Sequence, residues 1–244
     1  MTNALKVHLR LFDIHGITLR VVTLRPQTGV RFSTNYFHDT WHILGGPDAS
    51  ALLGRLLWGL AFQRLPGTLV LIDREHLVPT PFEADRPDPI LLVPDGLTHI
   101  DVDLLRALKL RLRRCPGPPT TIRWHTFSIA EPERRYDLNH SRERMSRLAG
   151  FICYTAPPDI LRSNGYGISR MGSRGYFSLA ERDRSKHWRV DGEFQLIGDF
   201  RRKVSAAMVA RAEILDGADR AIADRPELER IYDRQDRVLQ RRVH

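Results

Sequence analysis

Residues 163–177 read SNGYGISRMGSRGYF and combine four glycines, two arginines and three aromatic residues. Glycine lets backbone N–H groups come close to a bulky anion and readily adopts positive φ. Arginine pairs with phosphate through two hydrogen bonds, and aromatic rings stack on bases. Because the segment has neither helical nor strand periodicity, we predict a loop that holds a nucleic-acid backbone. An ordinary exposed loop can have the same composition, so this interpretation depends on the rest of the chain.

The charge of the chain points to the same class of partner. Its 244 residues carry a formal net charge of +9, and the isoelectric point is near 10.1. Such an excess of basic residues favours binding to an anionic polymer, and nucleic acid is the first candidate. The basic residues are dispersed along the chain and not confined to one amphipathic helix, which makes a membrane surface a poorer candidate.

Composition and the N-terminal sequence predict a cytoplasmic protein with no membrane partner. Hydrophobic residues make up 42% of the chain and charged residues 27%, as in folded globular proteins. No apolar run is long enough to span a bilayer, and the N-terminal sequence lacks the apolar core of a signal peptide. Cys115 and Cys153 are isolated, so neither a disulfide framework nor a cysteine-based zinc site is expected.

The sequence also contains one pattern typical of a metal site and one typical of a nucleotide-binding loop, and both are incomplete. His38 and His42 have the H-x3-H spacing of a helical zinc site, but the intervening Asp-Thr-Trp lacks the glutamate of H-E-x-x-H. Gly167 and Gly172 have the spacing of a P-loop, but Ser173-Arg174 replaces its lysine and hydroxyl residue. We therefore expect no metal ion and no cofactor.

Carboxylates and histidines provide the remaining candidates for catalysis. Asp73 and Glu75 follow a strand, as the acids of many nucleases do, but no partner lysine accompanies them, and we interpret them as surface acids. A histidine could act as the general base on a 2′-hydroxyl in metal-free RNA cleavage. No sequence neighbour defines such a role for any of them, which favours a non-catalytic protein. The candidates by position are His15, His38, His42 and His125.

The elements that must position these residues follow from hydrophobic periodicity. Alternating or continuous apolar residues predict strands, and His15-Gly16 is the expected turn of an N-terminal hairpin. Apolar residues at helical spacing predict two helices, one beginning near Pro47 and the other capped by Asp101. The predicted strands cover 5–13, 17–25, 30–38, 68–73, 90–93 and 120–129. The predicted helices cover 48–64 and 102–114.

From the second hairpin strand onward, this order corresponds to the βαββαβ arrangement of a ferredoxin-like fold, an antiparallel sheet backed by two helices. We therefore predict an α+β protein with a ferredoxin-like core, an N-terminal hairpin and a C-terminal helical extension. A helix over 141–150 is also expected. The predicted division is a ferredoxin-like domain over 1–130, a basic glycine- and arginine-rich loop region over 131–192, and C-terminal helices over 193–244.

Two stretches together resemble a known family. Gly172-Ser173-Arg174-Gly175-Tyr176 resembles the glycine-rich loop of the RAMP superfamily, the ferredoxin-like subunits of CRISPR effector complexes. Residues 45–57, GGPDASALLGRLL, are similar to the segment in which a glycine- or serine-containing turn opens the first helix of those subunits. Phe177 stands where the family often has glycine, and Pro47-Asp48 replaces its usual small residues.

The resemblance implies a protein that holds a guide RNA by its backbone, with the glycine-rich loop against the phosphates. It also implies that the start of the first helix lies near the same groove. The RNA-binding residues predicted on this basis are Ser50, Arg55, Arg162, Arg170, Gly172, Ser173, Arg174, Gly175 and Tyr176.

Three hypotheses for function follow. The leading one is a non-catalytic RNA-binding subunit of a ribonucleoprotein complex in antiviral defence, with other protein subunits as partners. The first alternative is a metal-independent endoribonuclease that processes RNA with a histidine general base. The second alternative is a protein-interaction subunit whose tail helices bind a partner and which does not bind nucleic acid. RNA affinity that falls steeply with salt would separate the leading hypothesis from the last one.

Overall fold

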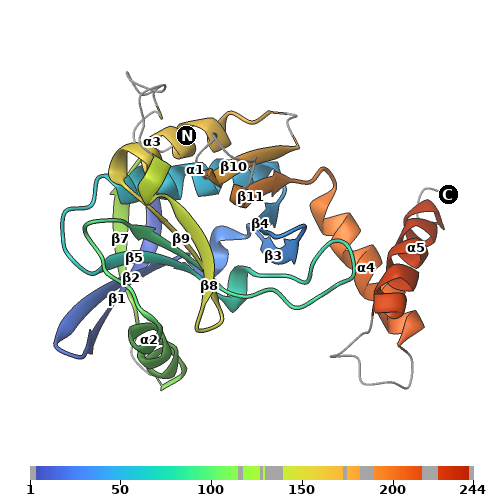
Figure 1. Cartoon of the computed structure of the whole chain (residues 1–244), viewed down its shortest axis with the longest axis horizontal. Helices are drawn as coiled ribbons and strands as arrows, with labels where there is room; N and C mark the ends of the chain where they lie inside the picture. Colours follow the sequence, from blue (N-terminus) through green and yellow to red (C-terminus); the bar gives the residue numbers. More distant parts are fainter. Residues whose placement is uncertain are drawn as a thin grey trace.

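The computed structural model describes residues 4–114, 118–126, 129, 140–172, 175–181, 190–215 and 225–241 (Figure 1). They form eleven β-strands and five α-helices, which confirms the predicted α+β class. The strands are β1 (Ala4–Ile14), β2 (Ile17–Thr23), β3 (Phe32–Phe37), β4 (Thr40–Gly45), β5 (Thr68–Ile72), β6 (Ile90–Pro94), β7 (Thr120–His125), β8 (Arg144–Leu148), β9 (Phe151–Ala156), β10 (Tyr176–Glu181) and β11 (Val190–Leu196). The helices are α1 (Pro47–Ala61), α2 (Val102–Arg114), α3 (Pro158–Ser169), α4 (Phe200–Ile214) and α5 (Arg225–Arg241).

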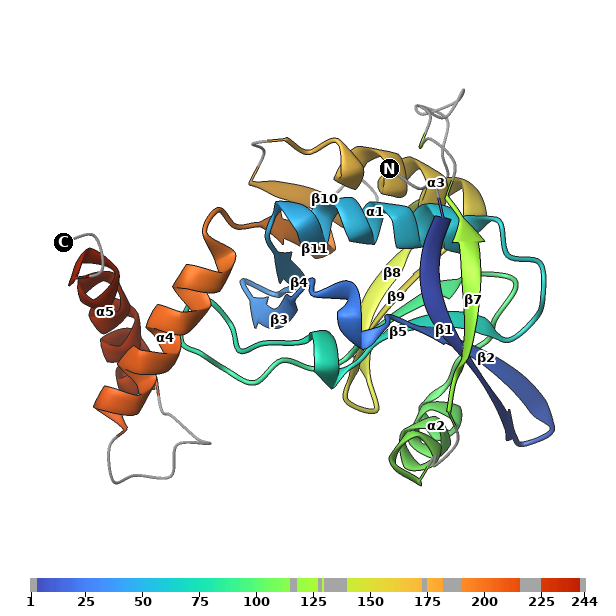
Figure 2. The same cartoon turned by 180° about the vertical axis from the view of Figure 1, so that it is seen from behind.

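Seven strands form one mixed sheet in the order β7-β1-β2-β5-β6-β9-β8. Helices α1 and α3 cover one face of this sheet, and α2 covers the other (Figures 1 and 2). In β5, Val70 and Ile72 belong to the apolar core on the α1 side, whereas Leu69 and Leu71 belong to the core on the α2 side. A strand that is buried on both faces is apolar along its whole length, which explains the continuous apolar runs of β5 and β6.

The strand pairing differs from the predicted antiparallel sheet backed by two helices. β2 runs parallel to its neighbour β5, and β6 runs parallel to β9. The connection from β2 to β5 contains β3, β4 and α1, and this long path returns the chain to the same end of the sheet. The two helices that pack together on one face are α1 and α3, and not the predicted pair α1 and α2.

Several local signals in the sequence are confirmed. β1 and β2 pair antiparallel around His15 and Gly16, whose φ values of 52° and 77° suit a tight hairpin turn. The Oδ1 atom of Asp101 accepts a hydrogen bond from the backbone N–H of Leu104 at 2.8 Å and so caps α2. Pro47 occupies the first position of α1, where the missing backbone N–H has no partner to lose.

Helix α3 corrects the prediction of a loop over 163–177, because residues 163–169 are helical. A Cβ atom on Gly54 of α1 would lie 2.6 Å from the carbonyl oxygen of Gly165 in α3. A Cβ atom on Gly165 would in turn lie 2.8 Å from the carbonyl oxygen of Gly54. These two glycines therefore allow close contact between two helices, and their presence is explained by packing and not by anion binding.

The described residues of the region 131–192 complete both sheets and do not form a loop region. Residues 141–142 end a short 3₁₀ turn, and β8 with the turn after it occupies 144–150, so the predicted α-helix over 141–150 is wrong. Met145 is buried while Arg144 and Arg147 are exposed, and exposed charges on an edge strand discourage pairing with other chains. β10 and β11 pair with the β3–β4 hairpin in a second sheet of order β10-β11-β4-β3.

Helices α4 and α5 form an arm that projects from the two sheets (Figures 1 and 2). They lie in the region 193–244 that was predicted to be helical, although residues 193–196 belong to β11. One small apolar cluster anchors the base of α4, and another joins α4 to α5. The first contains Leu44, Ile197, Phe200 and Val204, and the second contains Ala210, Leu215 and Ile231. Among the described helices, none has both the length and the apolar character needed to cross a membrane.

Candidate nucleic-acid interface

A cation and two aromatic rings lie at the end of α3 and the start of β10. Arg170 is exposed, and its guanidinium carbon lies 5.4 Å from the ring centroid of Tyr166. Tyr176, the first residue of β10, is 66% exposed. A guanidinium group held over a ring and a second exposed ring are suited to contact phosphates and bases.

The backbone between Arg170 and Tyr176 is open in its described part. Gly172 has a φ of 58°, and no heavy atom lies within 4 Å of the position that a Cβ atom of Gly175 would occupy. Ser173 and Arg174 lie outside the described residues. Gly167, by contrast, is tightly packed, because a Cβ atom there would lie 2.2 Å from an aromatic ring carbon of β10.

Ser50, Arg55 and Arg162, the predicted site residues on α1 and α3, are buried or partly buried. The Ser50 hydroxyl donates a hydrogen bond to the carbonyl oxygen of Pro47 at 3.1 Å. The Nε atom of Arg55 donates to the hydroxyl of Thr126 at 3.0 Å. The Nε atom of Arg162 is buried without a hydrogen-bond partner among the described residues. Of these three residues, only the two arginines keep appreciable surface for a ligand.

The two stretches that carry the family resemblance lie at the same end of the α1–α3 pair. The two helices pack antiparallel, with Gly54 of α1 against Ser169 at the end of α3. The consecutive backbone N–H groups of residues 196–197 donate to the carbonyl oxygens of Gly175 and Gly45, each at 2.8 Å. The structure therefore brings the start of α1 and the 170–176 segment together, although they are far apart in the sequence.

A groove lies beside α2, on the face of the seven-stranded sheet opposite to α1 and α3. Its volume is about 980 Å³, and it is lined by residues of β1, of the 73–89 segment, of α2 and of the β8–β9 turn. We call it the basic groove. His8 and Arg10 reach it because alternate residues of β1 point to this face. Its basic lining residues are His8, Arg10, Arg74, Arg86, Lys109, Arg113 and Arg147. Its acidic lining residues are Asp73, Glu75 and Asp88.

Two of the cations in the basic groove are engaged by the protein. The Nε atom of Arg147 lies 2.7 Å from the Asp88 carboxylate, and the Nζ atom of Lys109 donates to the carbonyl oxygen of Ala149 at 3.1 Å. The side chains of the four other arginines make no hydrogen bond or ion pair within the described part of the chain. These four are Arg10, Arg74, Arg86 and Arg113. Because these side chains have no ion-pair partner among the described residues, their charges make the groove attractive to a polyanion.

The environment of the basic groove shifts the pKa values of two lining residues. Burial lowers the pKa of His8, and the positive charges of Arg25 and Arg10 lower it further. Its imidazole is therefore neutral near pH 7 in the free protein. Burial raises the pKa of Asp73, while the nearby His76 acts in the opposite direction.

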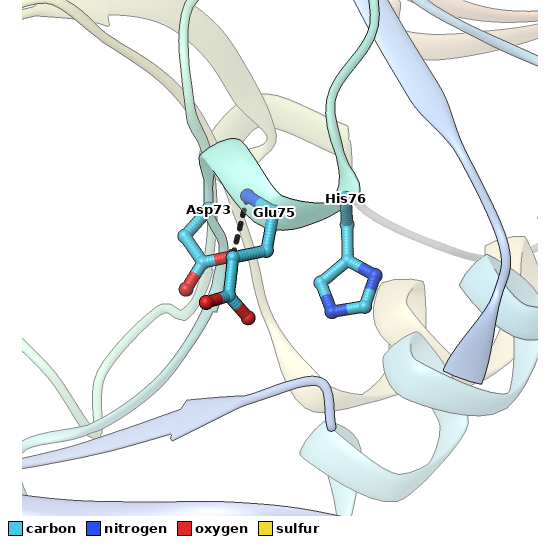
Figure 3. Close-up of side chains that lie close together, drawn as sticks. All are labelled: Asp73, Glu75 and His76. Carbon is cyan, nitrogen blue, oxygen red and sulfur yellow. Dashed lines mark hydrogen bonds between the residues drawn. The ribbon is translucent and has the colours of Figure 1, made fainter. Parts of the chain in front are cut away.

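Asp73, Glu75 and His76 gather where β5 ends, around the short 3₁₀ helix η2 (Arg74–His76) (Figure 3). One potential ligand atom from each residue lies within 4.8 Å of the other two. The Asp73 carboxylate accepts a hydrogen bond from the backbone N–H of Glu75 at 3.3 Å. Sequence reasoning interpreted the two acids as surface groups and did not include His76, which is fully buried.

A second cluster surrounds a buried carboxylate. The side chain of Glu143 is 1% exposed and accepts hydrogen bonds from the Tyr154 hydroxyl at 2.6 Å and from the Asn164 amide at 2.7 Å. The Nδ1 atom of His140, which is 36% exposed, lies 2.7 Å from the other carboxylate oxygen. Burial and the charge of Glu143 raise the pKa of Tyr154 well above its ordinary value. A histidine oriented by a buried carboxylate is the arrangement used by general bases.

The four histidines proposed from the sequence lie elsewhere. His15 and His38 lie in hairpin turns with positive φ. His42 is buried in β4, with its Nε2 atom 2.9 Å from the Glu193 carboxylate. The side chain of His125 lies outside the described residues. The signal that was missed is the H-x-x-E spacing of His140 and Glu143 across η3 (His140–Arg142), because residues three apart lie on the same side of a 3₁₀ turn.

The basic groove was also missed, because its residues come from segments that are distant in the sequence. The available signal was the alternation in β1, because His8 and Arg10 lie on the same face of the strand as Phe12, which packs in the apolar core beside α2.

Comparisons of the chain with protein-family models, with curated proteins and with solved structures find no match. Inference about function therefore depends on the geometry and charge described above.

Proposed function

We propose that this protein is a non-catalytic RNA-binding subunit of a ribonucleoprotein complex that holds RNA by its sugar–phosphate backbone. The observation that carries the proposal is the basic groove, in which the side chains of four arginines make no hydrogen bond or ion pair with the described residues. These are Arg10, Arg74, Arg86 and Arg113. Cations that are free of internal partners can release counterions from RNA phosphates without first breaking protein contacts. Contacts of this kind bind a backbone but do not read a sequence.

The 170–176 segment provides a second contact surface in this proposal. Arg170 and Tyr176 are exposed there, and Gly172 and Gly175 leave the backbone open to a phosphate. The resemblance to guide-RNA-binding subunits rests on this segment and on residues 45–57, which the fold places nearby. A ferredoxin-like origin of the core belongs to the same proposal, with α3 in place of the predicted α2 as the second helix beside α1 on one face of the sheet.

Fluorescence anisotropy with a labelled single-stranded RNA tests this function. We expect the affinity of the unaltered protein to fall linearly on a log–log plot against salt concentration. Alanine at Arg74, Arg86 and Arg113 should lower the magnitude of that slope by about 2, since each lost phosphate contact contributes about 0.7 on single strands. No binding at low salt, or binding that does not respond to salt, would refute the proposal.

A matched control removes the same charge elsewhere. Arg64, Arg106 and Arg111 are exposed and do not line the basic groove. Alanine at these three positions lowers the net charge equally, so an equal loss of affinity would show that only the overall charge matters. A separate variant with alanine at Arg170 and Tyr176 measures the contribution of the second surface.

The contact between His140 and Glu143 favours a second candidate function, a metal-independent endoribonuclease. The buried carboxylate orients the imidazole, which is partly exposed and could remove the proton of a 2′-hydroxyl. Incubation of the protein with structured RNA in EDTA tests this candidate. Specific cleavage that is lost in His140→Ala and retained in His15→Ala would support it, and RNA that remains intact would exclude it.

A further inference from the structure

The wall of the basic groove contains one place where the charge is reversed. At the end of β5, the carboxylates of Asp73 and Glu75 lie side by side, and the imidazole of His76 lies next to them (Figure 3). We propose that Asp73, Glu75 and His76 bind a divalent transition-metal ion such as Mn²⁺ or Zn²⁺.

The distances suit a site that closes around an ion. One ligand atom from each residue already lies within 4.8 Å of the other two. Two ligands of the same ion, each about 2.1 Å from the metal, stand roughly 3 Å apart. Glu75 is exposed, so its side chain is free to rotate over the remaining distance.

The strongest independent sign of a ligand is the Nε2 atom of His76. This atom is fully buried, and no hydrogen-bond partner for it exists among the described residues. Figure 3 shows it on the side of the ring that faces the Glu75 carboxylate. A buried polar atom without a partner is unfavourable and calls for an explanation. A metal ion between the imidazole and the carboxylates would satisfy its lone pair.

The other nitrogen of the same ring has an acceptor within reach, which favours the tautomer that metal binding requires. The Nδ1 atom of His76 lies 3.4 Å from the carbonyl oxygen of Val30, to which an Nδ1–H group can donate. The Nε2 atom is then unprotonated and presents its lone pair. Histidine ligands of metal ions commonly donate their second N–H to a backbone carbonyl in this way.

The set of donors narrows the choice of ion and leaves room for a further ligand. One imidazole with two carboxylates suits Mn²⁺ or Zn²⁺ better than Mg²⁺, which prefers oxygen ligands alone. Three protein ligands leave at least one position open, and Asp73 and Glu75 both line the basic groove. If RNA occupies that groove, a phosphate oxygen could take the open position. This last step rests on the proposed function, whereas the metal site itself does not.

Titration of the metal-free, full-length protein with Mn²⁺ alone, monitored by the EPR signal of free Mn²⁺, tests the site. We expect one equivalent to bind, with at least about tenfold weaker binding in Asp73→Asn and in Glu75→Gln. Asp88→Asn removes the same charge from the same groove and should bind as the unaltered protein does. Equal weakening in all three variants would show only a general electrostatic effect and would overturn the proposal.

His76 is buried, so its replacement could disturb folding, and a spectroscopic measurement avoids this problem. Electron spin-echo envelope modulation of Mn²⁺ bound to the unaltered protein should show coupling to a ¹⁴N nucleus of the imidazole. Bound Mn²⁺ without nitrogen coupling, or no saturable binding, would overturn the proposal. Both experiments are done without RNA, so their outcome is independent of whether the protein binds nucleic acid.

Discussion

Cys153 lies in β9 and shows how strongly the packed sheet can suppress the chemistry of a side chain. Burial raises the pKa of its thiol to about 12 from the ordinary 9.0. Near pH 8, the reactive thiolate is therefore about a thousandfold rarer than in an ordinary cysteine. We expect Cys153 in a Cys115→Ser variant to resist iodoacetamide while folded and to react after denaturation. Mass spectrometry measures both states, and rapid labelling of the folded variant would contradict the structure.

His8 gives the basic groove a dependence on pH. Because burial and nearby arginines lower the pKa of His8, the free protein carries a neutral imidazole near neutral pH. A polyanion in the groove stabilises the protonated form, so binding takes up a proton and affinity should rise as pH falls. We expect tighter RNA binding at about pH 5.5 than at about pH 7.5. The increase should shrink in His8→Asn, and an identical pH profile would place RNA away from His8.

For individual residues, the sequence predicted the types of side chain at the candidate site better than it predicted which residues lie there. The exposed Arg170 and Tyr176 agree with the predicted segment, but Ser50 is buried against its own helix. Neither His140 nor Glu143 was recognised, because the carboxylate of Glu143 acquires its role through burial between β9 and α3. Burial of that kind depends on tertiary packing, which the local pattern of residues does not encode.

Among the helices and strands, the close contact between α1 and α3 gives the most specific prediction, which concerns the stability of a Gly54→Ala variant. Alanine in an unobstructed helix stabilises by about 1 kcal/mol relative to glycine. In Gly54→Ala, the new Cβ atom would lie 2.6 Å from a backbone carbonyl oxygen, which cannot move without shifting α3. We therefore expect a net loss of about 1–3 kcal/mol in the free energy of unfolding, measured by urea denaturation.

Gly175→Ala is the control for this substitution. Its new Cβ atom would have no heavy atom within 4 Å, so the free energy of unfolding should change little. If Gly54→Ala were as stable as the control, the close approach of the two helices would be incorrect.

Helices and strands with a clear hydrophobic periodicity were predicted from the sequence. Elements whose periodicity is interrupted by glycines or by exposed arginines were not. α1 and α2 have apolar stripes and recognisable first turns, and the N-terminal hairpin has a clear turn. α3 was hidden because its glycines serve contact with α1 and β10. β8 was hidden because an edge strand exposes its arginines. Strand order could not be predicted, since parallel pairing depends on how connections of many residues cross the sheet.

For the whole molecule, the arm formed by α4 and α5 should be the least stable part of those described. It is held to the rest by small apolar clusters and by polar contacts to the 79–89 connection, such as those of Arg211 with Asp85 and of Gln235 with Pro81. We expect backbone amides of α5 to exchange hydrogen at least about tenfold faster than those of α1. Hydrogen exchange with mass spectrometry measures this, and equal protection would show that the arm unfolds together with the sheets.

The sheet that separates the 170–176 segment from the basic groove has a consequence for any RNA that reaches both. The two surfaces lie on opposite faces, so one strand of RNA could touch both only by passing around an edge of the sheet. The nucleotides in that passage would remain open to solvent. A footprint on bound RNA would then consist of two protected windows separated by a reactive gap, and a single continuous window would mean that one face alone holds the strand.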